Sequence, residues 1–569
     1  MNSKVWQIIN KKGKKKIIDV LLENRGIFSL RQKEEFLNPK KPEHLGLKEL
    51  GISDKSVGRA IERIKTAIAK NEEIVVYGDY DVDGVCAAAA LWECLYKFTS
   101  KISPHIPNRF SEGYGINPES VENLKFKIKN LKLIITVDNG IVAHEGIKKA
   151  NMFGIDVIVT DHHTKEKKLP SAHSIIHTTK IGGAAIAWFF AREIDKKIKN
   201  PSQVANGKKQ IPALELAALG TIADQLPLVG PNRSIAKWGL EELNKTRRLG
   251  LLALLDESGI AFKGSTLQGL PLKGVKIGTY EVNFVIAPRL NAAGRMEHAI
   301  DALRLICTRD PQRAKELASH LGRINKDRQK TVEEVVAKAR SLAQAHLREP
   351  LIISGNYHEG VIGLVAGKLA EEFYRPAIVI SKGKTFSKAS ARSIAGFNII
   401  EVIRKIGGLI EGGGGHPMAA GFTIKTTNIE KFKSKFSAIA KKYLTKSVLW
   451  RKLRIDCELD FSEISQSLVD ALETFTPTGL GNPTPVFATR KVMVLDAKAI
   501  GAEGKHLKLY LEASGIKFSA IGFGWGGLRP KLSPDKKVDV VYSIDENIWN
   551  GQTNLQLVIK DIKVLGSNS

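Results

Sequence analysis

The sequence predicts an α/β protein made of a parallel-sheet domain, a smaller α/β lobe joined to it by a long helix, and a small β-barrel at the carboxyl end. From about residue 73 to 180, apolar runs alternate with helical segments, as in βαβ units whose strands are buried on both faces. Asp310 and Pro311 then open a long charged helical pattern with a typical cap and first-turn proline. After about residue 450, short strand-like runs alternate with turns.

Several domains are expected, because 569 residues exceed what one hydrophobic core organises. The N-terminal part is polar and lysine-rich, and its KKGKKK run at 11–16 suits either a solvated face or contact with a polyanion. The patterns divide the chain into a cap (1–65), a main α/β domain (66–309), a connecting helix (310–347), a second lobe (348–446) and a barrel (447–569).

The second lobe and the barrel show different strand patterns. In the second lobe, LIISG and PAIVIS predict strands on either side of a helix, and EGGGGHPMAAG predicts a glycine-rich turn. The last segment contains five or so short strand-like runs, such as HLKLYLEA and VDVVYSI. This spacing predicts a small barrel of the OB type.

The chain has a strong basic surplus. It contains 87 Lys and Arg against 59 Asp and Glu, a formal net charge of +28, which favours a polyanionic partner, either nucleic acid or an anionic membrane surface. No apolar window approaches the roughly 18 to 20 residues of a membrane-spanning helix, and no signal-peptide pattern follows the first lysines. We therefore expect no membrane insertion and a cytoplasmic location. The four cysteines form no CxxC pair, which argues against a disulfide scaffold or thiolate metal site.

Acidic or imidazole side chains follow three of the predicted strands. DYDVDG follows VVYG, Asp138 follows LIITV, and DHH follows VIVT. Because the carboxyl ends of parallel strands meet at one edge of a sheet, we expect these side chains to lie together. Asp224, where a later helix gives way to a loop, is a further candidate ligand. A mixed set of carboxylate oxygens and imidazole nitrogens suits Mn²⁺ better than Ca²⁺.

Such a set suits phosphoester hydrolysis. Two divalent cations roughly 3.5 to 4 Å apart lower the pKa of a bridging water and neutralise charge on the attacking and leaving oxygens. No nucleophile elbow, P-loop or HExxH helix offers a competing chemistry.

In these motifs the sequence resembles the DHH phosphoesterase superfamily, whose pattern is a DxD strand end, a second strand ending in Asp, a DHH turn and a later Asp. Other segments resemble its single-strand-specific exonuclease branch, and together they spread over most of residues 70 to 565. Among them are IPNRFSEGYGIN, ADQLPLVGPNR, APRLNAAGRM, SARSI and GGGGHPMAAGF. His177 and Thr178 depart from the Asn-Pro pair common there. The resemblance implies a DHH domain, a DHH-associated second lobe and an OB-like nucleic-acid-binding domain.

The resemblance also implies roles for individual residues. Two Mn²⁺ or Mg²⁺ ions would be held by Asp81, Asp83, Asp138, His162 and Asp224, with Asp138 bridging them. His163 would contact the scissile phosphate, and Asp79 and Asp161 would support the ligands from behind. Phosphate contacts would come from Arg109, Arg289, Asn291, Arg295, Ser390, Arg392, Gly414, Gly415 and His416.

Some of these assignments leave alternatives open. A surface salt bridge is an equally good account of Arg109, Arg289 and Arg295. Tyr80, Phe110 and Tyr114 are candidates for stacking on bases, and core packing explains them as well.

The function that the resemblance implies is a single-stranded-DNA-specific exonuclease that works from 5′ to 3′ in DNA repair and recombination. Single-stranded DNA would be its substrate, a single-stranded DNA-binding protein or a helicase would be candidate partners, and the chain would be a monomer. Two alternatives remain: an oligonucleotide phosphodiesterase similar to a nanoRNase, and a non-catalytic nucleic-acid-binding scaffold. The basic surplus and the carboxyl-terminal β-domain favour a polymer substrate, and the complete ligand set favours catalysis.

Overall fold

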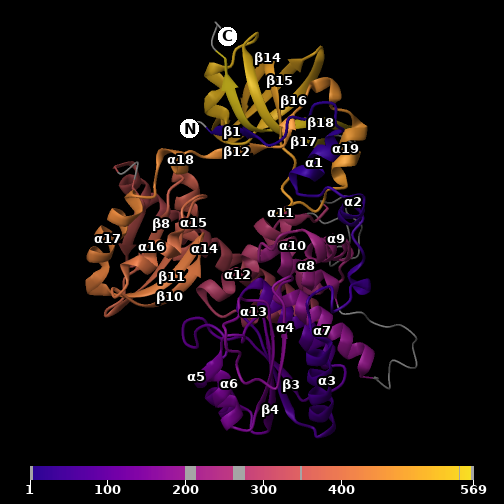
Figure 1. Cartoon of the computed structure of the whole chain (residues 1–569), viewed down its shortest axis with the longest axis vertical. Coiled ribbons are helices and arrows are strands. Elements are labelled where there is room, and N and C mark those ends of the chain that lie inside the picture. Colours follow the sequence, from indigo (N-terminus) through magenta and orange to yellow (C-terminus); the bar gives the residue numbers. More distant parts are fainter. Residues whose placement is uncertain (1–3, 199–212, 261–275, 346–348, 550–551, 566–569) are drawn as a thin grey trace. The chain divides into compact units, whose positions relative to one another are not determined.

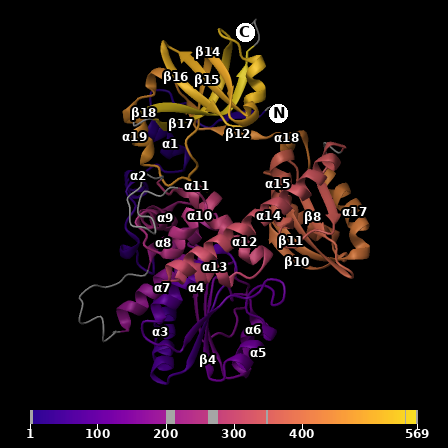
Figure 2. The same ribbon diagram turned by 180° about the vertical axis from the view of Figure 1, so that it is seen from behind.

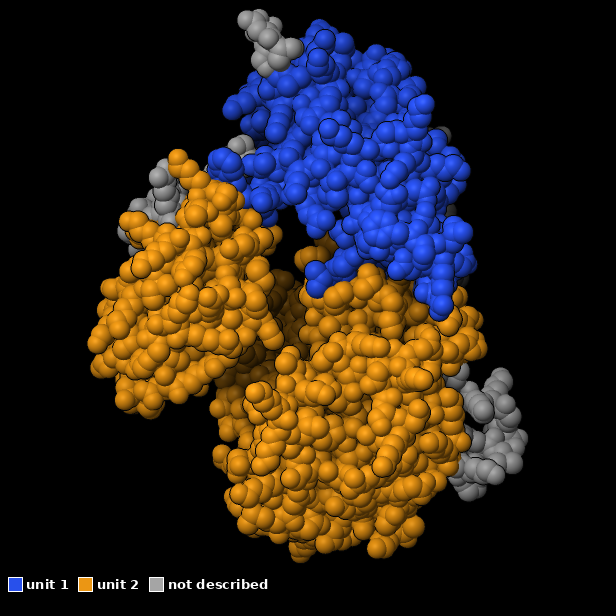
Figure 3. All heavy atoms as spheres, viewed as in Figure 1, with its two compact units in different colours: residues 1–39, 450–569 blue, residues 40–449 orange. Residues whose placement is uncertain are grey.

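The computed structural model describes residues 4–198, 213–260, 276–345, 349–549 and 552–565. These residues form two compact units, one of residues 40–449 and one that joins residues 1–39 to residues 450–569 (Figure 3). Among the described residues, no helix combines the length and the apolar character needed to cross a bilayer.

The larger unit contains the predicted parallel sheet. Its strand order is β3-β2-β4-β5-β6, and every neighbouring pair is parallel. The strands are β2 (Glu73–Tyr77), β3 (Ile102–His105), β4 (Leu131–Val137), β5 (Asp156–Asp161) and β6 (Ser174–His177). Their carboxyl ends share one edge, so the loops after β2, β4 and β5 are neighbours.

Helices cover both faces of this sheet, as its apolar strands require. One face packs against α3 (Asp54–Ala69), α4 (Val82–Leu95) and α7 (Gly183–Lys197), and the other packs against α5 (Pro118–Lys127) and α6 (His144–Met152). The same separation is visible from both sides of the molecule in Figures 1 and 2. Successive strand residues alternate between the two cores: Val76 belongs to the first, and Val75 and Tyr77 belong to the second.

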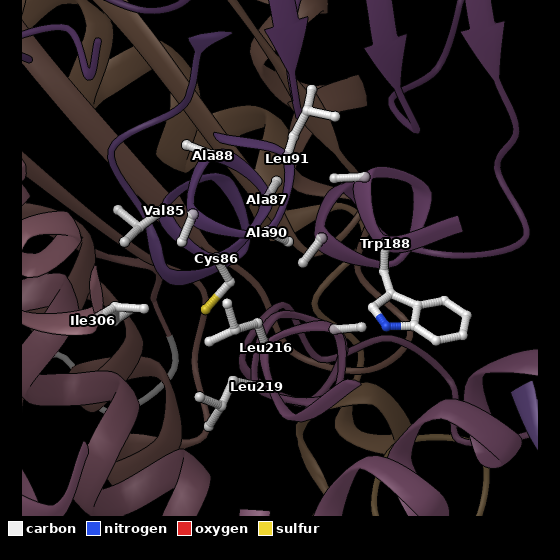
Figure 4. Close-up of a cluster of buried hydrophobic side chains, with 14 of the residues drawn as sticks. Val85, Cys86, Ala87, Ala88, Ala90, Leu91, Trp188, Leu216, Leu219 and Ile306 are labelled. Carbon is white, nitrogen blue, oxygen red and sulfur yellow. The ribbon is translucent and has the colours of Figure 1, made fainter. Parts of the chain in front are cut away.

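Helix α4 is the central helix of the first core. Its run of alanines is buried and packs among Trp188 of α7, Leu216 and Leu219 of α8 (Leu214–Ala223) and Ile306 of α13 (Ile300–Cys307), as Figure 4 shows. Small side chains on α4 let its neighbours approach closely. This packing holds the first turn of α4, with Asp83, next to the first turn of α7.

A helical region follows the sheet and ends in the predicted connecting helix. It contains α8, α9 (Gly230–Leu243), α10 (Leu249–Glu257), α11 (Thr279–Glu281), the π-helix η2 (Val282–Ile286), α12 (Ala287–Met296) and α13. The connecting helix α14 (Pro311–Ala345) has 35 residues. Its predicted cap is confirmed, because the Asp310 carboxylate accepts from the Gln312 and Arg313 amides.

The second lobe is a mixed sheet, in the order β10-β11-β9-β8-β7. Strands β7 (Leu351–Gly355) and β8 (Ala377–Ser381) are parallel and flank α15 (Ile362–Phe373), as predicted. Strand β8 then pairs antiparallel with β9 (Phe386–Arg392), and β9 pairs antiparallel with β11 (Ala419–Lys425).

The prediction of a glycine-rich turn in this lobe was wrong in its main part. Residues Ile410–His416 form the exposed edge strand β10, which pairs antiparallel with β11, and only Pro417 and Met418 make the turn. Glycine is depleted in strands, so its run concealed the strand. Hydrogen bonds from the neighbouring β11 backbone supply the order that the side chains do not.

The smaller unit contains the predicted OB-like barrel. Its main strands are β14 (Phe487–Ile500), β15 (His506–Ala513), β16 (Ile516–Gly522), β17 (Lys537–Trp549) and β18 (Gln552–Val564). They follow the order β14-β15-β16-β18-β17, and β17 pairs back onto β14 to close the barrel. Strand β16 is parallel to β18, whereas the other pairs are antiparallel. The β14–β17 pairing closes these five strands, and the short strand β13 (Cys457–Glu458) adds to β14 in parallel.

The predicted N-terminal cap over 1–65 is divided between the two units. Strand β1 (Val5–Ile8) pairs with β12 (Lys452–Ile455), and Leu21 and Phe36 are buried in the barrel core. Helix α3 instead packs against the main sheet. The partner of each segment therefore decides to which unit it belongs.

Candidate active site

The loops at the carboxyl edge of the main sheet bring the predicted acidic and imidazole groups together. Asp83, His162 and Asp224 offer ligand atoms that all lie within 4.8 Å of one another. The His162 Nε2 atom lies 3.8 Å from an Asp83 oxygen, 3.8 Å from an Asp224 oxygen and 3.1 Å from Asp138 Oδ1. Groups from β4, β5, α4 and the end of α8 therefore face one centre.

A second group adjoins the first. Asp79, Asp81 and Asp138 also offer oxygens within 4.8 Å of one another. Asp138 thus belongs to the second group and also lies next to His162 of the first group. This position between the two groups suits a ligand shared by two cations. Asp79, which the sequence analysis placed behind the ligands, lies within this group and is therefore a further candidate ligand.

Asp83 is held by the start of α7. The Gly183 and Ala184 amides donate to its carboxylate over 2.7 and 2.9 Å. A Cβ added at Gly220 would collide with Asp83, and one added at Gly183 would collide with Asp138. Gly183 and Gly220 are therefore site residues that sequence reasoning missed. In the sequence they are ordinary glycines of the segments IGG and LGT, and nothing there marks them as neighbours of the acids.

Asp138 stands in a conformation that points to a ligand. Its φ of 62° is in the left-handed region, which costs free energy for a residue with a side chain. Its Oδ1 atom is buried and makes no hydrogen bond within the described residues, although His162 is close. A buried carboxylate oxygen left this way fits coordination of a cation.

Four of the site's carboxyl groups, those of Asp79, Asp83, Asp138 and Asp224, hold protons more tightly than usual because their pKa values are raised. Burial, with the charges of Asp224 and Asp81, raises the pKa of Asp83 to about 8. Burial and Asp83 raise the pKa of Asp138, and burial and Asp81 raise the pKa of Asp79. The pKa of Asp224 rises to about 6 through burial and Asp81. Acids packed this closely repel one another when ionised, and divalent cations relieve that repulsion.

The two histidines of the DHH turn differ in charge. Burial, with the neighbouring His163, lowers the pKa of His162 to about 4, so its imidazole is neutral and has a lone pair for a metal. Burial opposes charge on His163 as well, but a hydrogen bond and the charge of Asp161 outweigh it and raise the pKa to about 9. A cationic His163 suits contact with a phosphate.

Asp161 fixes this turn. Its carboxylate accepts from the Ile141, His162 and His163 amides and lies 2.8 Å from His163 Nδ1. It therefore orients the imidazole of His163 and not that of the candidate ligand His162. His177, at the departure from the superfamily pattern, places its Nε2 2.7 Å from the His163 carbonyl oxygen and supports the same turn.

Several predicted phosphate contacts gather near one another. The Arg295 pKa is lowered to about 10 by burial and by the charges of Arg109, Arg328 and, more weakly, Arg392. Burial also lowers the pKa of Arg392, whose guanidinium contacts Ser390 Oγ and the Ala391 carbonyl. A buried guanidinium whose pKa is lowered by neighbouring positive charges favours a bound anion. Arg328 was not among the residues singled out from the sequence.

Other predicted contacts have structural partners. Arg289 pairs with Glu257 over 2.7 Å and donates to the Val285 carbonyl, which is the salt-bridge alternative. Asn291 accepts from the Val82 amide over 3.1 Å and so braces the DxD loop. Gly414, Gly415 and His416 lie on the exposed strand β10.

Two of the predicted aromatic residues contact each other beside the cluster, and the third contacts the second lobe. Tyr114 makes edge contacts with Tyr80 and His163, with centroids 6.1 and 6.2 Å apart. Phe110 makes an edge contact with His358 of the second lobe, 5.6 Å away. Phe110 and Tyr114 are exposed, whereas Tyr80 packs partly against the core, so the first two remain open to a base.

Family models match three segments of the chain. They are the DHH family N-terminal domain over residues 73–221, the DHHA1 domain over 342–442 and the RecJ OB domain over 455–561. The first contains the metal-site loops up to Thr221, and the second contains the Ser390 and Arg392 strand. The fold and the acidic edge therefore define a protein of the DHH class.

Curated relatives narrow this class. The single-stranded-DNA-specific exonuclease RecJ of Bacillus subtilis is 34% identical over 565 residues, which cover 96% of this chain and 68% of that protein. The RecJ of Thermus thermophilus is 30% identical over 516 residues, 90% of this chain and 71% of its own length. The chain belongs to the RecJ family.

Solved structures agree with this assignment. The crystal structure of RecJ from Thermus thermophilus in complex with Mn²⁺ matches with a TM-score of 0.80 and 27% identity, over 99% of this chain and 80% of that one. The Mg²⁺ complex of RecJ from the same organism matches with a TM-score of 0.74 and 26% identity, over 99% of this chain and 79% of that one.

Proposed function

We propose that this protein is a single-stranded-DNA-specific exonuclease that hydrolyses terminal phosphodiesters with two divalent cations, Mn²⁺ or Mg²⁺. The observation that carries the proposal is the pair of adjoining ligand groups, Asp83–His162–Asp224 and Asp79–Asp81–Asp138, at one edge of a sheet. Membership of the RecJ family supports the substrate class.

The ligands would be Asp81, Asp83, Asp138, His162 and Asp224, with Asp79 as a sixth candidate. Two cations held there would lower the pKa of an attacking water and neutralise charge on the leaving oxygen. The protein's own contribution is to fix the oxygens, keep His162 neutral and present His163 as a cation to the scissile phosphate. Asp161 sustains that last role through its hydrogen bond to His163.

The strand would be positioned by its phosphates. Arg109, Arg295 and Arg392 with Ser390 would hold the phosphate at the end of the strand, so that one nucleotide reaches the metals. The proposed direction, 5′ to 3′, comes from the family resemblance. Gly414, Gly415 and His416 of β10 would contact the next phosphates through an exposed backbone.

Two rival functions are less well supported. A nanoRNase-like oligonucleotide phosphodiesterase has no need of the barrel that matches the RecJ OB domain over residues 455–561. A scaffold without catalysis has no need of a buried Asp138 oxygen that accepts no hydrogen bond from the described residues and lies beside five further candidate ligands.

The wider assignments are proposals of the same kind. The protein would serve DNA repair and recombination as a cytoplasmic monomer, with a single-stranded DNA-binding protein or a helicase as a partner. Its functional domains would be the DHH domain (66–309), the connecting helix (310–347), the DHH-associated domain (348–446) and the OB-like domain (447–569).

The deciding experiment uses the full chain with Mn²⁺ and a single strand labelled at its 5′ or its 3′ end. We expect the 5′ label to appear first as a mononucleotide, and Asp81→Ala to remove this activity. Asp470→Ala, an exposed carboxylate of the smaller unit, is the matched control and should retain it. Equal activity of Asp81→Ala and the parent would exclude the metal mechanism, and early release of the 3′ label would reverse the direction.

A further inference from the structure

An exposed pair of stacked aromatic rings lies outside the site described above. Tyr280 of α11 and Phe284 of η2 have ring centroids 4.8 Å apart and an angle of 33° between their planes. Each residue is 65% exposed. Large aromatic side chains are usually buried, so two of them exposed together, in contact and four residues apart on one helical face, need a reason.

The pair is tied to the metal-site loop. Asn283 lies between Tyr280 and Phe284 in the sequence, and its side chain accepts a hydrogen bond of 2.7 Å from the Gln225 side chain. Gln225 directly follows the candidate ligand Asp224 and has a left-handed φ of 57°. The helical turn that carries the rings is thus fastened to the residue next to a ligand.

The backbone that presents the rings is itself unusual. Residues Val282–Ile286 form a π-helix, a rare turn that often occurs at functional sites. Val282 and Ile286 are buried at its two ends, while Phe284 between them faces solvent. The helix continues directly into α12, whose Asn291 accepts from the Val82 amide of the DxD loop and which also carries Arg295.

We propose that Tyr280 and Phe284 form a stacking platform for a nucleobase of the single strand that enters the candidate active site. This inference rests on the proposed function and adds a base-binding site to it. The occupant is a base because flat aromatic faces take any of the four bases. The helical run that carries the rings is hydrogen-bonded through Asn283 to the residue after Asp224, and through Asn291 to the DxD loop. The groups proposed to hold the strand near the metals grip phosphates, and the platform supplies the contact to bases.

The first measurement is binding without catalysis. A fluorescent 20-nucleotide poly-dT strand is titrated with the full chain in EDTA, and the dissociation constant is taken from anisotropy. We expect Tyr280→Ala/Phe284→Ala to weaken binding about tenfold. Phe284→Trp should retain the affinity of the parent, whereas Phe284→Leu should lose affinity, because leucine is apolar but offers no flat ring. Equal affinity of the Leu and Trp variants would overturn stacking as the cause.

The matched control is Phe126→Ala. Phe126 is 90% exposed and lies in the last turn of α5. The loop that carries Arg109 and Tyr114 leads into the opposite end of this helix, its first turn. Its removal should leave binding unchanged. Thermal unfolding of all variants should stay near that of the parent, since both platform rings are mostly solvated; a large drop for the double variant would assign the pair to folding and overturn the proposal.

The second measurement locates the base. A single abasic nucleotide is moved along the poly-dT strand from the 5′ end, and binding is measured for each strand. The parent should show one or two positions where the abasic site weakens binding, and the double alanine variant should lose that dependence. An identical abasic profile in both proteins would contradict the platform. These assays need no cleavage. A protein that binds in this way but does not digest DNA would therefore contradict the proposed function and still support the stacking platform.

Discussion

The acidic edge of the main sheet and the glycine-rich edge of the second lobe are both assigned to substrate in the proposed function, but they are built in opposite ways. At the first edge, Asp83 and Asp138 are almost fully buried, and Gly183 and Gly220 are needed so that α7 and α8 can reach them. At the second edge, all but the first residue of β10 are exposed, and a Cβ added at Gly414 would meet nothing within 4 Å. Ligands for cations must be held rigidly before the ions arrive, whereas a strand of variable sequence needs only an open backbone to approach.

The largest expected effect comes from breaking the buried edge at a ligand. Asp83→Asn keeps the shape of the side chain but removes its charge, so nuclease activity should fall on the order of 10³-fold. Mn²⁺ should raise the melting temperature of the parent, because it binds only the folded state, and it should do so much less in the variant. A full Mn²⁺-dependent stabilisation in Asp83→Asn would show that this carboxylate is not a ligand.

A crowding change at the same edge should come next. Gly220→Ala places a methyl group against Asp83 and Ala184, so we expect a loss of about 1–3 kcal/mol in stability and about 10² in activity. Gly367→Ala is the matched control, since that helical position in α15 has nothing within 4 Å and alanine should stabilise it by about 0.5–1 kcal/mol. Chemical denaturation and nuclease assays check both. Similar behaviour of the two variants would mean that the glycine contacts at the buried edge are not required.

In the second lobe, a change of side chain should act on binding more than on stability. Arg392→Ala removes a guanidinium whose pKa is already lowered by burial, and we expect KM for a single strand to rise about tenfold. Arg392→Lys keeps the charge but loses the planar guanidinium with its two parallel donors, so its KM should lie between those of the parent and Arg392→Ala. An unchanged KM in Arg392→Ala would remove this residue from the phosphate contacts.

The smallest effect should come from the open strand. Gly414→Ala has room for its methyl group and should leave stability the same or raise it by up to about 1 kcal/mol. Affinity for single-stranded DNA should fall a fewfold, because the methyl group stands where a phosphate would approach the backbone. Unchanged affinity, measured by fluorescence anisotropy, would leave β10 with a purely structural role.

Much of this molecule could be predicted where local pattern and strand order act together. The parallel strands and the meeting of Asp138 with the DHH turn followed from apolar runs and from the rule that carboxyl ends share an edge. The glycine-rich strand β10 and the division of residues 1–65 could not be predicted in this way. Their structure depends on partners that are distant in sequence, β11 for the first and the barrel core for residues 1–39.

The sequence by itself determined the chemistry of the protein: which carboxylates and imidazoles end the strands, how many arginines are available, and that the charge suits a polyanion. Only the tertiary structure decided which atoms meet, because distances between side chains depend on how helices pack. Packing of α7 and α8 against α4 buries Asp83 and leaves no room for a side chain at Gly183 or Gly220. The folded loops bring Asp79 within reach of Asp81 and Asp138, and the packing of α12 pairs Arg289 with Glu257.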